Sequence, residues 1–292
     1  MKKHKKNLIL NSIVLFFLTS IMLTSCEQDN SSIDDDALSQ DLASATTQTE
    51  IDGVSEAVDD IIDNTSFDFT SNTVEKGADS KTTEEQAFLP DCVTITKVIT
   101  SSSKKVILDY GDGCTTRNDN YLSGKIMIEM NYSVAETSIN IDYTFDDFYF
   151  NGKKIEGEVH KFKMRINENG NPEATINRDI KIIWEDGSFV SVKGERKREW
   201  VAGFGNDLWG DNVFLITGTW TITQKDGTVN TATVMEPLER NMACRFLVSG
   251  IIEIQKNDKK LLLNYGDGAC DDLAVVTING KEHEIHLRKR KR

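Results

Sequence analysis

A pair of cysteines and a Gly-Asp-Gly turn occur twice in the chain in nearly the same order, and this spacing suggests a covalent framework. "KKVILDYGDGC" ends at Cys114 and "KKLLLNYGDGAC" ends at Cys270, and a further cysteine, Cys92 or Cys244, lies upstream of each copy. Cysteines that frame a pair of antiparallel strands come close enough to be joined. The duplication therefore predicts two disulfides, each within one copy: Cys92–Cys114 and Cys244–Cys270.

Metal sites are the alternatives for the same residues. Structural zinc sites usually contain closely spaced cysteine pairs, and the chain has no CxxC pair. Asp112 and Asp267, in the Gly-Asp-Gly turns, could offer oxygen ligands to calcium, although the surrounding spacing is not that of a calcium loop. We expect a tight structural turn, with Asp112 and Asp267 kept as weak calcium candidates and no cofactor.

The stretch "WVAGFGNDLWGD" places Trp200, Phe204 and Trp209 among glycines and short polar residues, which is typical of a loop. Aromatic faces on a loop of a rigid scaffold can bind a carbohydrate, so these three are the candidate ligand-binding residues. The favoured alternative is that they fold inward and cap the core. We expect Trp200 to be the more buried and Trp209 the more exposed.

Paired carboxylates are the remaining candidates for catalysis. Asp146, Asp147, Glu156 and Glu158 flank one predicted hairpin, and a suitably spaced pair could hydrolyse a glycosidic bond. With 47 acids in the chain, however, such clusters arise by chance. The sequence contains no nucleophile elbow, P-loop or zinc-protease motif. We therefore assign no catalytic residue and expect a protein that is not an enzyme.

The first 25 residues read as an export signal: a lysine-rich start, an apolar run and a small-residue cleavage site. The motif "LTSC", which ends at Cys26, resembles the lipobox of bacterial lipoproteins. This resemblance implies cleavage before Cys26 and a lipid on its sulfur. We therefore expect an outer-membrane protein anchored by lipid, on the periplasmic or the cell-surface face.

The acidity of the chain is concentrated behind this anchor. Residues 27–91 hold 18 acids against two lysines, whereas residues 92–292 hold 29 acids against 28 bases. A nearly neutral folded part argues against a nucleic-acid partner. Residues 26–87 offer little apolar surface to offset the entropy of ordering, so we expect a mostly disordered acidic tether. Within it, a short amphipathic helix is predicted by the spacing of Ile51, Val54, Val58, Ile61 and Ile62.

Residues 88–292 are predicted to form one all-β domain. Five turn dipeptides separate stretches of alternating polarity: Asn151-Gly152, Asn169-Gly170, Asp186-Gly187, Asp226-Gly227 and Asn279-Gly280. In "KKIEGEVHKFKMRIN" the apolar alternation changes parity between Val159 and Phe162, which we interpret as a bulge. The expected fold is a large curved antiparallel sheet, a sandwich or a barrel, with duplicated hairpin units at 92–130 and 244–288.

The features "YGDGC", "GDNVFLITGTWTITQKDG", "PLERNMACRFLVSG" and "YGDGACDDLAVVTINGKEHEIHLR" resemble an uncharacterised family of Bacteroidota lipoproteins. The resemblance covers residues 88–288 and implies a β-rich envelope lipoprotein with no particular activity. The leading hypothesis is a lipid-anchored, non-enzymatic binding or structural module with a carbohydrate or envelope-protein ligand. The alternatives are a glycan-active enzyme and an accessory subunit of a surface nutrient-capture complex.

The lipid anchor can be tested directly at Cys26. Cys26→Ser removes the sulfur that would carry the lipid, so the protein should move from the membrane to the soluble fraction after cell disruption. Fractionation and immunoblotting measure this. Unchanged membrane association would refute the assignment.

Overall fold

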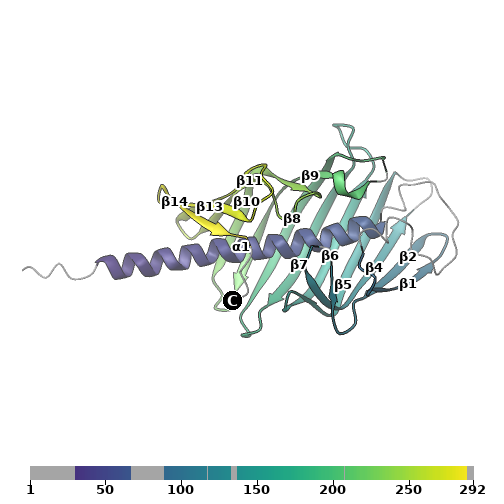
Figure 1. The fold of residues 1–292 in the computed structure, drawn as a ribbon, viewed down its shortest axis with the longest axis horizontal. Helices are drawn as coiled ribbons and strands as arrows, with labels where there is room; N and C mark the ends of the chain where they lie inside the picture. The colour runs from purple at the N-terminus through teal and green to yellow at the C-terminus, as the bar shows by residue number, and fades with distance from the viewer. Residues whose placement is uncertain (1–29, 67–88, 117, 133–136, 207, 288–292) are drawn as a thin grey trace, which may run out of the picture. The chain divides into compact units, whose positions relative to one another are not determined.

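The structure, a computed structural model, describes residues 30–66, 89–116, 118–132, 137–206 and 208–287. Its main element is one antiparallel sheet of 14 strands that does not close into a barrel. Strands that follow one another in the chain are neighbours in the sheet, except that the short β3 pairs only with β4. The all-β expectation is therefore confirmed, and the open curved sheet is the arrangement that occurs (Figure 1).

Among the described residues, one helix and one short 3-10 turn accompany the strands. The helix is α1 (Asn30–Ser66), and the 3-10 turn is η2 (Trp209–Asp211). The strands are β1 (Thr94–Ile99), β2 (Ser103–Asp109), β3 (Cys114–Thr115), β4 (Tyr121–Tyr132), β5 (Ser138–Phe150), β6 (Lys153–Met164), β7 (Glu173–Ile183), β8 (Phe189–Ala202), β9 (Val213–Gln224), β10 (Val229–Asn241), β11 (Ser249–Lys256), β12 (Lys259–Asp267), β13 (Leu273–Ile278) and β14 (Lys281–His286).

All five turn dipeptides lie between strands that pair with each other, so these hairpin predictions are confirmed. Asn151 and Gly152 both have positive φ, as do Asn279 and Gly280. Two successive residues with positive φ match the right-handed twist of the flanking strands. The meander is therefore encoded locally, turn by turn.

Glycines inside the strands allow the sheet to bend. A side chain at Gly157 would place its first carbon 2.2 Å from the carbonyl oxygen of Asp179, and one at Gly218 would come equally close to that of Glu195. Both glycines have positive φ, at 110° and 139°. Register shifts in β5, β10 and neighbouring strands add to the bending.

Both disulfides join cysteines of the same hairpin unit, as the duplication predicts. Cys92 pairs with Cys114 and Cys244 with Cys270, with Cα atoms 5.7 and 5.3 Å apart. The first closes the β1–β2 hairpin and the second closes the β11–β12 hairpin. The two copies thus have the same local architecture near opposite ends of the sheet.

The acidic segment differs most from the expectation. It was predicted to be mostly a disordered tether with a short helix, but residues 30–66 form a continuous helix of 37 residues. Residues 41–66 belong to the same compact unit as the sheet. The composition argument failed because it counted only apolar burial, whereas this helix is held largely by charged side chains, as described below.

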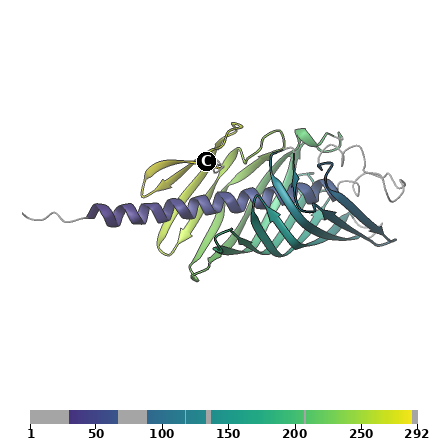
Figure 2. The same cartoon turned by 60° about the horizontal axis from the view of Figure 1, so that its bottom comes forward.

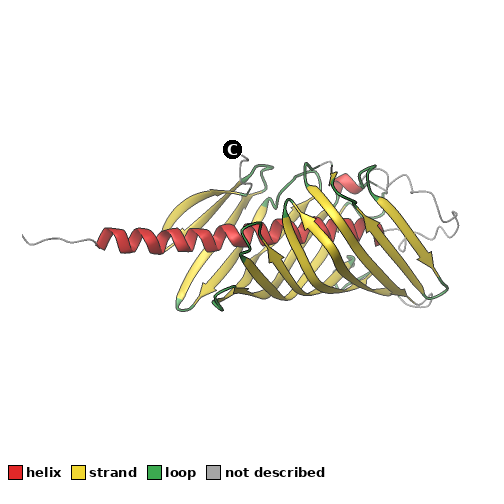
Figure 3. Ribbon diagram, turned by 90° about the horizontal axis from the view of Figure 1, so that it is seen from below, coloured by secondary structure: helices red, strands yellow, loops and turns green. Residues whose placement is uncertain are grey.

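The part of α1 from Asp41 onward is enclosed by the sheet. Its apolar residues Ile51, Val54, Val58, Ile61 and Ile62 are all buried, and so are most of its polar ones. Figures 2 and 3 show strands passing on more than one side of this part of the helix. Residues 41–66 therefore form the centre of the core.

A core truncation in the helix tests this arrangement. Ile62→Ala removes a side chain with no solvent exposure, and we expect it to lower the free energy of unfolding by about 2–5 kcal/mol. Ile166→Ala is the matched control, because Ile166 is 71% exposed and its loss should change little. Denaturant unfolding measures both. Equal stability of the two variants would show that α1 is not part of the core.

Candidate functional site

Six basic side chains that pair with carboxylates of α1 lie on the inner face of the sheet, which we define as the face that packs against residues 41–66. All six are buried and come from four strands: Lys161, Lys163, Arg178, Arg196, Arg198 and Arg240. They alternate along the strands with outward residues, as inward side chains must. The predicted bulge between Val159 and Phe162 is wrong. β6 pairs with β7 in unbroken register, and lysines rather than apolar residues continue the inner face.

The helix presents a matching acidic face. Asp52, Glu56, Asp59, Asp60 and Asp63 are all buried, and their spacing places them on adjacent turns of one side of α1. The carboxylates therefore face the cations across a region that water does not reach.

Ion pairs connect the two faces along the length of the helix. At one end, Asp63 accepts from Lys161 at 2.7 Å, and Lys163 lies 3.4 Å from the same oxygen. Asp59 pairs with Arg178 and also accepts the Tyr143 hydroxyl at 2.9 Å. These contacts join residues about 100 positions apart in the chain.

The pairing continues toward the other end through strands β8 and β10. Arg196 bridges Asp52 and Glu56, and Arg198 bridges Glu56 and Asp60. Arg240 donates to the opposite oxygen of Asp60 at 2.9 and 3.0 Å. Two aromatic rings support the guanidinium groups: Arg196 lies 3.9 Å from the Trp220 ring centroid, and Arg198 lies 4.1 Å from that of Phe214.

Burial and neighbouring charge oppose each other in setting the pKa values here. Burial acts to raise the pKa of Asp63, but Lys161, Lys163 and Arg198 outweigh it and hold this pKa below its usual range. The pKa of Asp59 is lowered in the same way, against burial, chiefly by Arg178. For Glu56 burial prevails and raises the pKa, despite Arg198 and Arg196.

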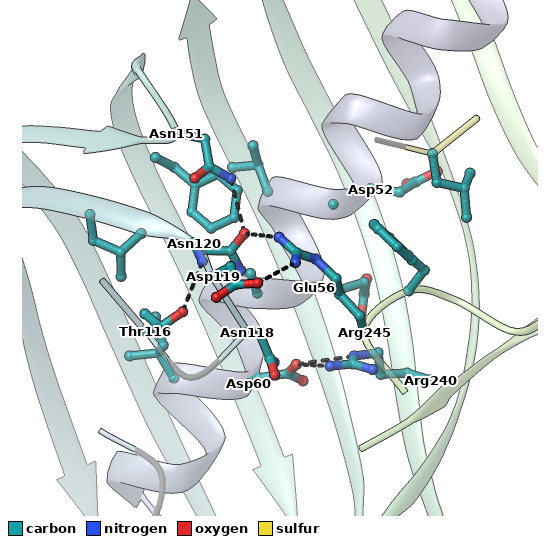
Figure 4. A pocket seen from close by; sticks show the side chains of 18 of the residues that line it. Asp52, Glu56, Asp60, Thr116, Asn118, Asp119, Asn120, Asn151, Arg240 and Arg245 are labelled. Atoms are coloured by element: carbon teal, nitrogen blue, oxygen red, sulfur yellow. Dashed lines mark hydrogen bonds and ion pairs between the residues drawn. The ribbon is translucent and has the colours of Figure 1, made fainter. Parts of the chain in front are cut away.

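A large pocket adjoins this charged core. It encloses about 1610 Å³ between α1, the loop at residues 116–121 and the loop at residues 242–247. Apolar and aromatic side chains form much of its wall, including Leu122, Phe150, Trp209, Phe246 and Leu247. Figure 4 shows polar side chains gathered on the wall made by the first loop.

The repeated motif, "KKVILDYGDGC" and "KKLLLNYGDGAC", contributes one buried tyrosine from each copy to this pocket. Tyr110 of "DYGDGC" and Tyr265 of "NYGDGAC" are 2% and 3% exposed, and both line it. Tyr265 donates its hydroxyl hydrogen to Asp52 at 2.6 Å. The Tyr110 hydroxyl has no hydrogen-bond partner among the described residues. The equivalent positions thus differ: α1 accepts a hydrogen bond from the Tyr265 hydroxyl, whereas it provides no acceptor for the Tyr110 hydroxyl.

The two loops meet at the pocket through one arginine. Arg245 reaches Asp119 at 3.4 Å and Asn120 at 3.5 Å, and Asn120 accepts from the Asn151 side chain at 2.9 Å (Figure 4). Arg245 follows Cys244, and the 116–121 loop follows Cys114. The disulfide units therefore position the loops on the two sides of the pocket.

The aromatic loop divides between core and pocket. Trp200 is buried, and its ring packs against Trp209 and Phe214 at centroid distances of 6.2 and 5.5 Å. Trp209 is half-buried and lines the pocket, whereas Phe204 is 45% exposed and lies outside its wall. Of the three predicted ligand-binding residues, the structure brings only Trp209 to the pocket.

The predicted calcium residues lie in exposed turns. Asp112 accepts the Tyr121 hydroxyl through its backbone carbonyl at 3.0 Å, and Asp267 ends β12. Among the described residues, no group of three or more acidic, histidine or cysteine side chains is arranged to hold a metal ion.

The carboxylates near the β5–β6 hairpin do not form an enclosed pair. Lys154 bridges Asp147 and Glu156 at 3.4 and 3.3 Å, and Asp146 and Glu158 are exposed. Within the pocket, the helix carboxylates of Asp52, Glu56 and Asp60 all pair with arginines.

Cys26, the predicted lipidation site, lies outside the described residues. No helix in the described part of the chain is both long and apolar enough to cross a membrane. No known protein family, curated protein or solved structure matches the chain. The resemblance to Bacteroidota lipoproteins therefore stays a prediction.

The inward charges were missed by sequence reasoning, although a signal was present. In "FVSVKGERKREW" the residues that share the face of Val190, Val192 and Trp200 include Arg196 and Arg198. Continuing the alternation would have placed both arginines inside. An isolated buried charge is costly, so an inward position for these arginines requires acidic partners that the strand itself does not supply.

The pairing at Asp63 predicts a specific dependence of stability on pH. Because folding lowers the pKa of Asp63 from 3.8, its contribution is complete above that value and is lost as the pH falls through the folded pKa. Asp63→Asn should lower the free energy of unfolding at pH 7 by about 3–5 kcal/mol and weaken the acid dependence below pH 4.

Asp179→Asn is the control, because Asp179 and Lys193 are also 2.7 Å apart but are both exposed. Its loss should cost at most about 1 kcal/mol. Urea titrations at several pH values compare the two variants. Similar losses in both would show that burial does not strengthen the Asp63 pairing.

Proposed function

We propose that this chain is a lipid-anchored envelope protein that acts as a non-enzymatic binding module, and that its ligand occupies the pocket beside α1. The pocket encloses about 1610 Å³, whereas ligand sites commonly enclose about 300–1,000 Å³. It is therefore large enough to hold a ligand. Its wall combines apolar and aromatic side chains with many polar and charged ones, so it can offer both apolar contact and hydrogen bonds to a ligand.

The Tyr110 hydroxyl is the observation that carries the proposal. A buried hydroxyl without a partner costs roughly 1–3 kcal/mol, so a native fold seldom keeps one without a use. Burial raises the pKa of Tyr110 above its usual value, so the group stays a neutral donor. At the equivalent position Tyr265 donates to a carboxylate. This hydroxyl is shielded from solvent in the structure, so a ligand oxygen would take the corresponding place at Tyr110 only when the side chains that cover it move aside.

These features favour an amphipathic ligand. Leu122, Phe150 and Leu247 offer apolar contact to its body, and the polar groups of Asn118, Asn120 and other loop residues can meet its head. A carbohydrate would use Trp209 but would leave much of the apolar wall without a matching surface.

The three carboxylates at the base of the pocket that come from the buried face of α1 support a binding role over a catalytic one. A glycoside hydrolase needs one carboxyl group free to donate a proton and a second free to attack or to activate water. Asp52, Glu56 and Asp60 are instead engaged by Arg196, Arg198 and Arg240.

Gly53 allows the pocket to be tested without damage to the fold. It lines the pocket from the helix, and a side chain built there meets nothing within 4 Å. Gly53→Leu should therefore occupy pocket space while improving helix propensity by up to about 1 kcal/mol. Gly53→Ala gains the same propensity with little intrusion.

The probe is 1-anilinonaphthalene-8-sulfonate, an amphipathic dye that fluoresces in apolar surroundings. We expect Gly53→Leu to weaken dye binding by about tenfold or more and Gly53→Ala to bind as the parent does. Thermal unfolding should show both variants at least as stable as the parent. If Gly53→Leu binds the dye with parental affinity, the pocket is not the binding site.

A further inference from the structure

The contact between residues 41–66 and the sheet is made by side chains. Across the described residues, no backbone hydrogen bond joins α1 to a strand. Instead the helix is held by its ion pairs, by the Tyr143 and Tyr265 hydroxyls and by its apolar residues. Replacement of this helix by an identical one from another copy would therefore break no strand pairing.

The inner face selects an acidic helix in particular. Buried ion pairs add little net stability over a well-packed apolar contact, because removing charges from water is costly. A helix without carboxylates at these positions, however, would leave six buried cations uncompensated. The charge pattern thus contributes mainly to specificity: it determines which helix can bind to the inner face.

A second copy of the chain carries an identical helix, so its carboxylates match the cations of the inner face. Residues 67–93 connect α1 to β1, and a chain of that length can extend over roughly 90 Å. Exchange of an identical element between two copies preserves every contact of the closed form and changes only the path of the connection.

We propose that the inner face of one copy binds residues 41–66 of a second copy, so that the chain forms helix-exchanged dimers in addition to the closed monomer. The basic inner face is then an intermolecular docking surface, and its partner is the acidic helix of another chain.

Charge reversal at one ion pair tests the exchange. Arg178 pairs with Asp59, so Asp59→Arg and Arg178→Asp each place like charges together in the core, and each variant alone should melt at a lower temperature than the parent. When the two variants are co-expressed with different tags, exchange gives one site with both native residues and one with both reversed. We expect a heterodimer as the main species, by tandem purification and light scattering, with a melting temperature above that of either variant.

Two controls keep the result interpretable. The double variant Asp59→Arg/Arg178→Asp restores opposite charges within one chain, so it should recover stability as a monomer. Two differently tagged parental copies, unfolded in urea and refolded together, should yield complexes that carry both tags. If the double variant recovers but neither mixture forms a two-tag dimer, the helix binds only its own sheet and the proposal is wrong. If the double variant also stays unstable, the parental mixture alone decides.

Discussion

The fold depends on the neutralisation of buried cations by an acidic helix. Six Lys and Arg side chains that pair with α1 lie on the inner face of the sheet, where each would incur a large desolvation cost if unpaired. α1 brings five carboxylates into the same dry space. The sheet does not close on itself by strand pairing. In a small closed barrel, side chains from the strands fill the interior, whereas here the helix fills it. Helix and sheet therefore have to fold together.

The parts of this fold that sequence reasoning predicted are those encoded locally. Asn151-Gly152 and Asn279-Gly280 adopt the positive φ angles that tight hairpins require, whatever the rest of the chain does. Cys92 and Cys114 lie at the two ends of one hairpin, so their approach follows from a single turn. Register shifts are different. They arise where a long sheet must bend, as between Thr144 and Phe148, and the alternation at Val159 pointed to the wrong place.

The helix and the charged core could not be read in the same way, because their stabilisation is non-local. Asp63 meets Lys161 across 98 residues, and neither segment alone shows that the other will cover it. By composition, residues 27–91 are strongly acidic and residues 92–292 are nearly neutral. The overall neutrality of the strands conceals an asymmetry: among the described residues, every buried acid belongs to α1, whereas the buried Lys and Arg side chains belong to the strands. The parity of Arg196 and Arg198 with Trp200, and of Arg178 with Ile176 and Ile180, carried that information.

The two copies of the repeated motif differ in how their tyrosines meet the acidic helix. Both copies staple a hairpin and direct one tyrosine inward, but the helix carries a carboxylate only where Tyr265 can reach it, at Asp52. Tyr110 lies beside the same helix and the same pocket without such a partner. If the hairpins were only structural, a phenylalanine at 110 would pack without the cost of a buried, unpaired hydroxyl. One copy therefore secures the helix, and the other places a residue with a buried, unpaired hydroxyl in the wall of the pocket.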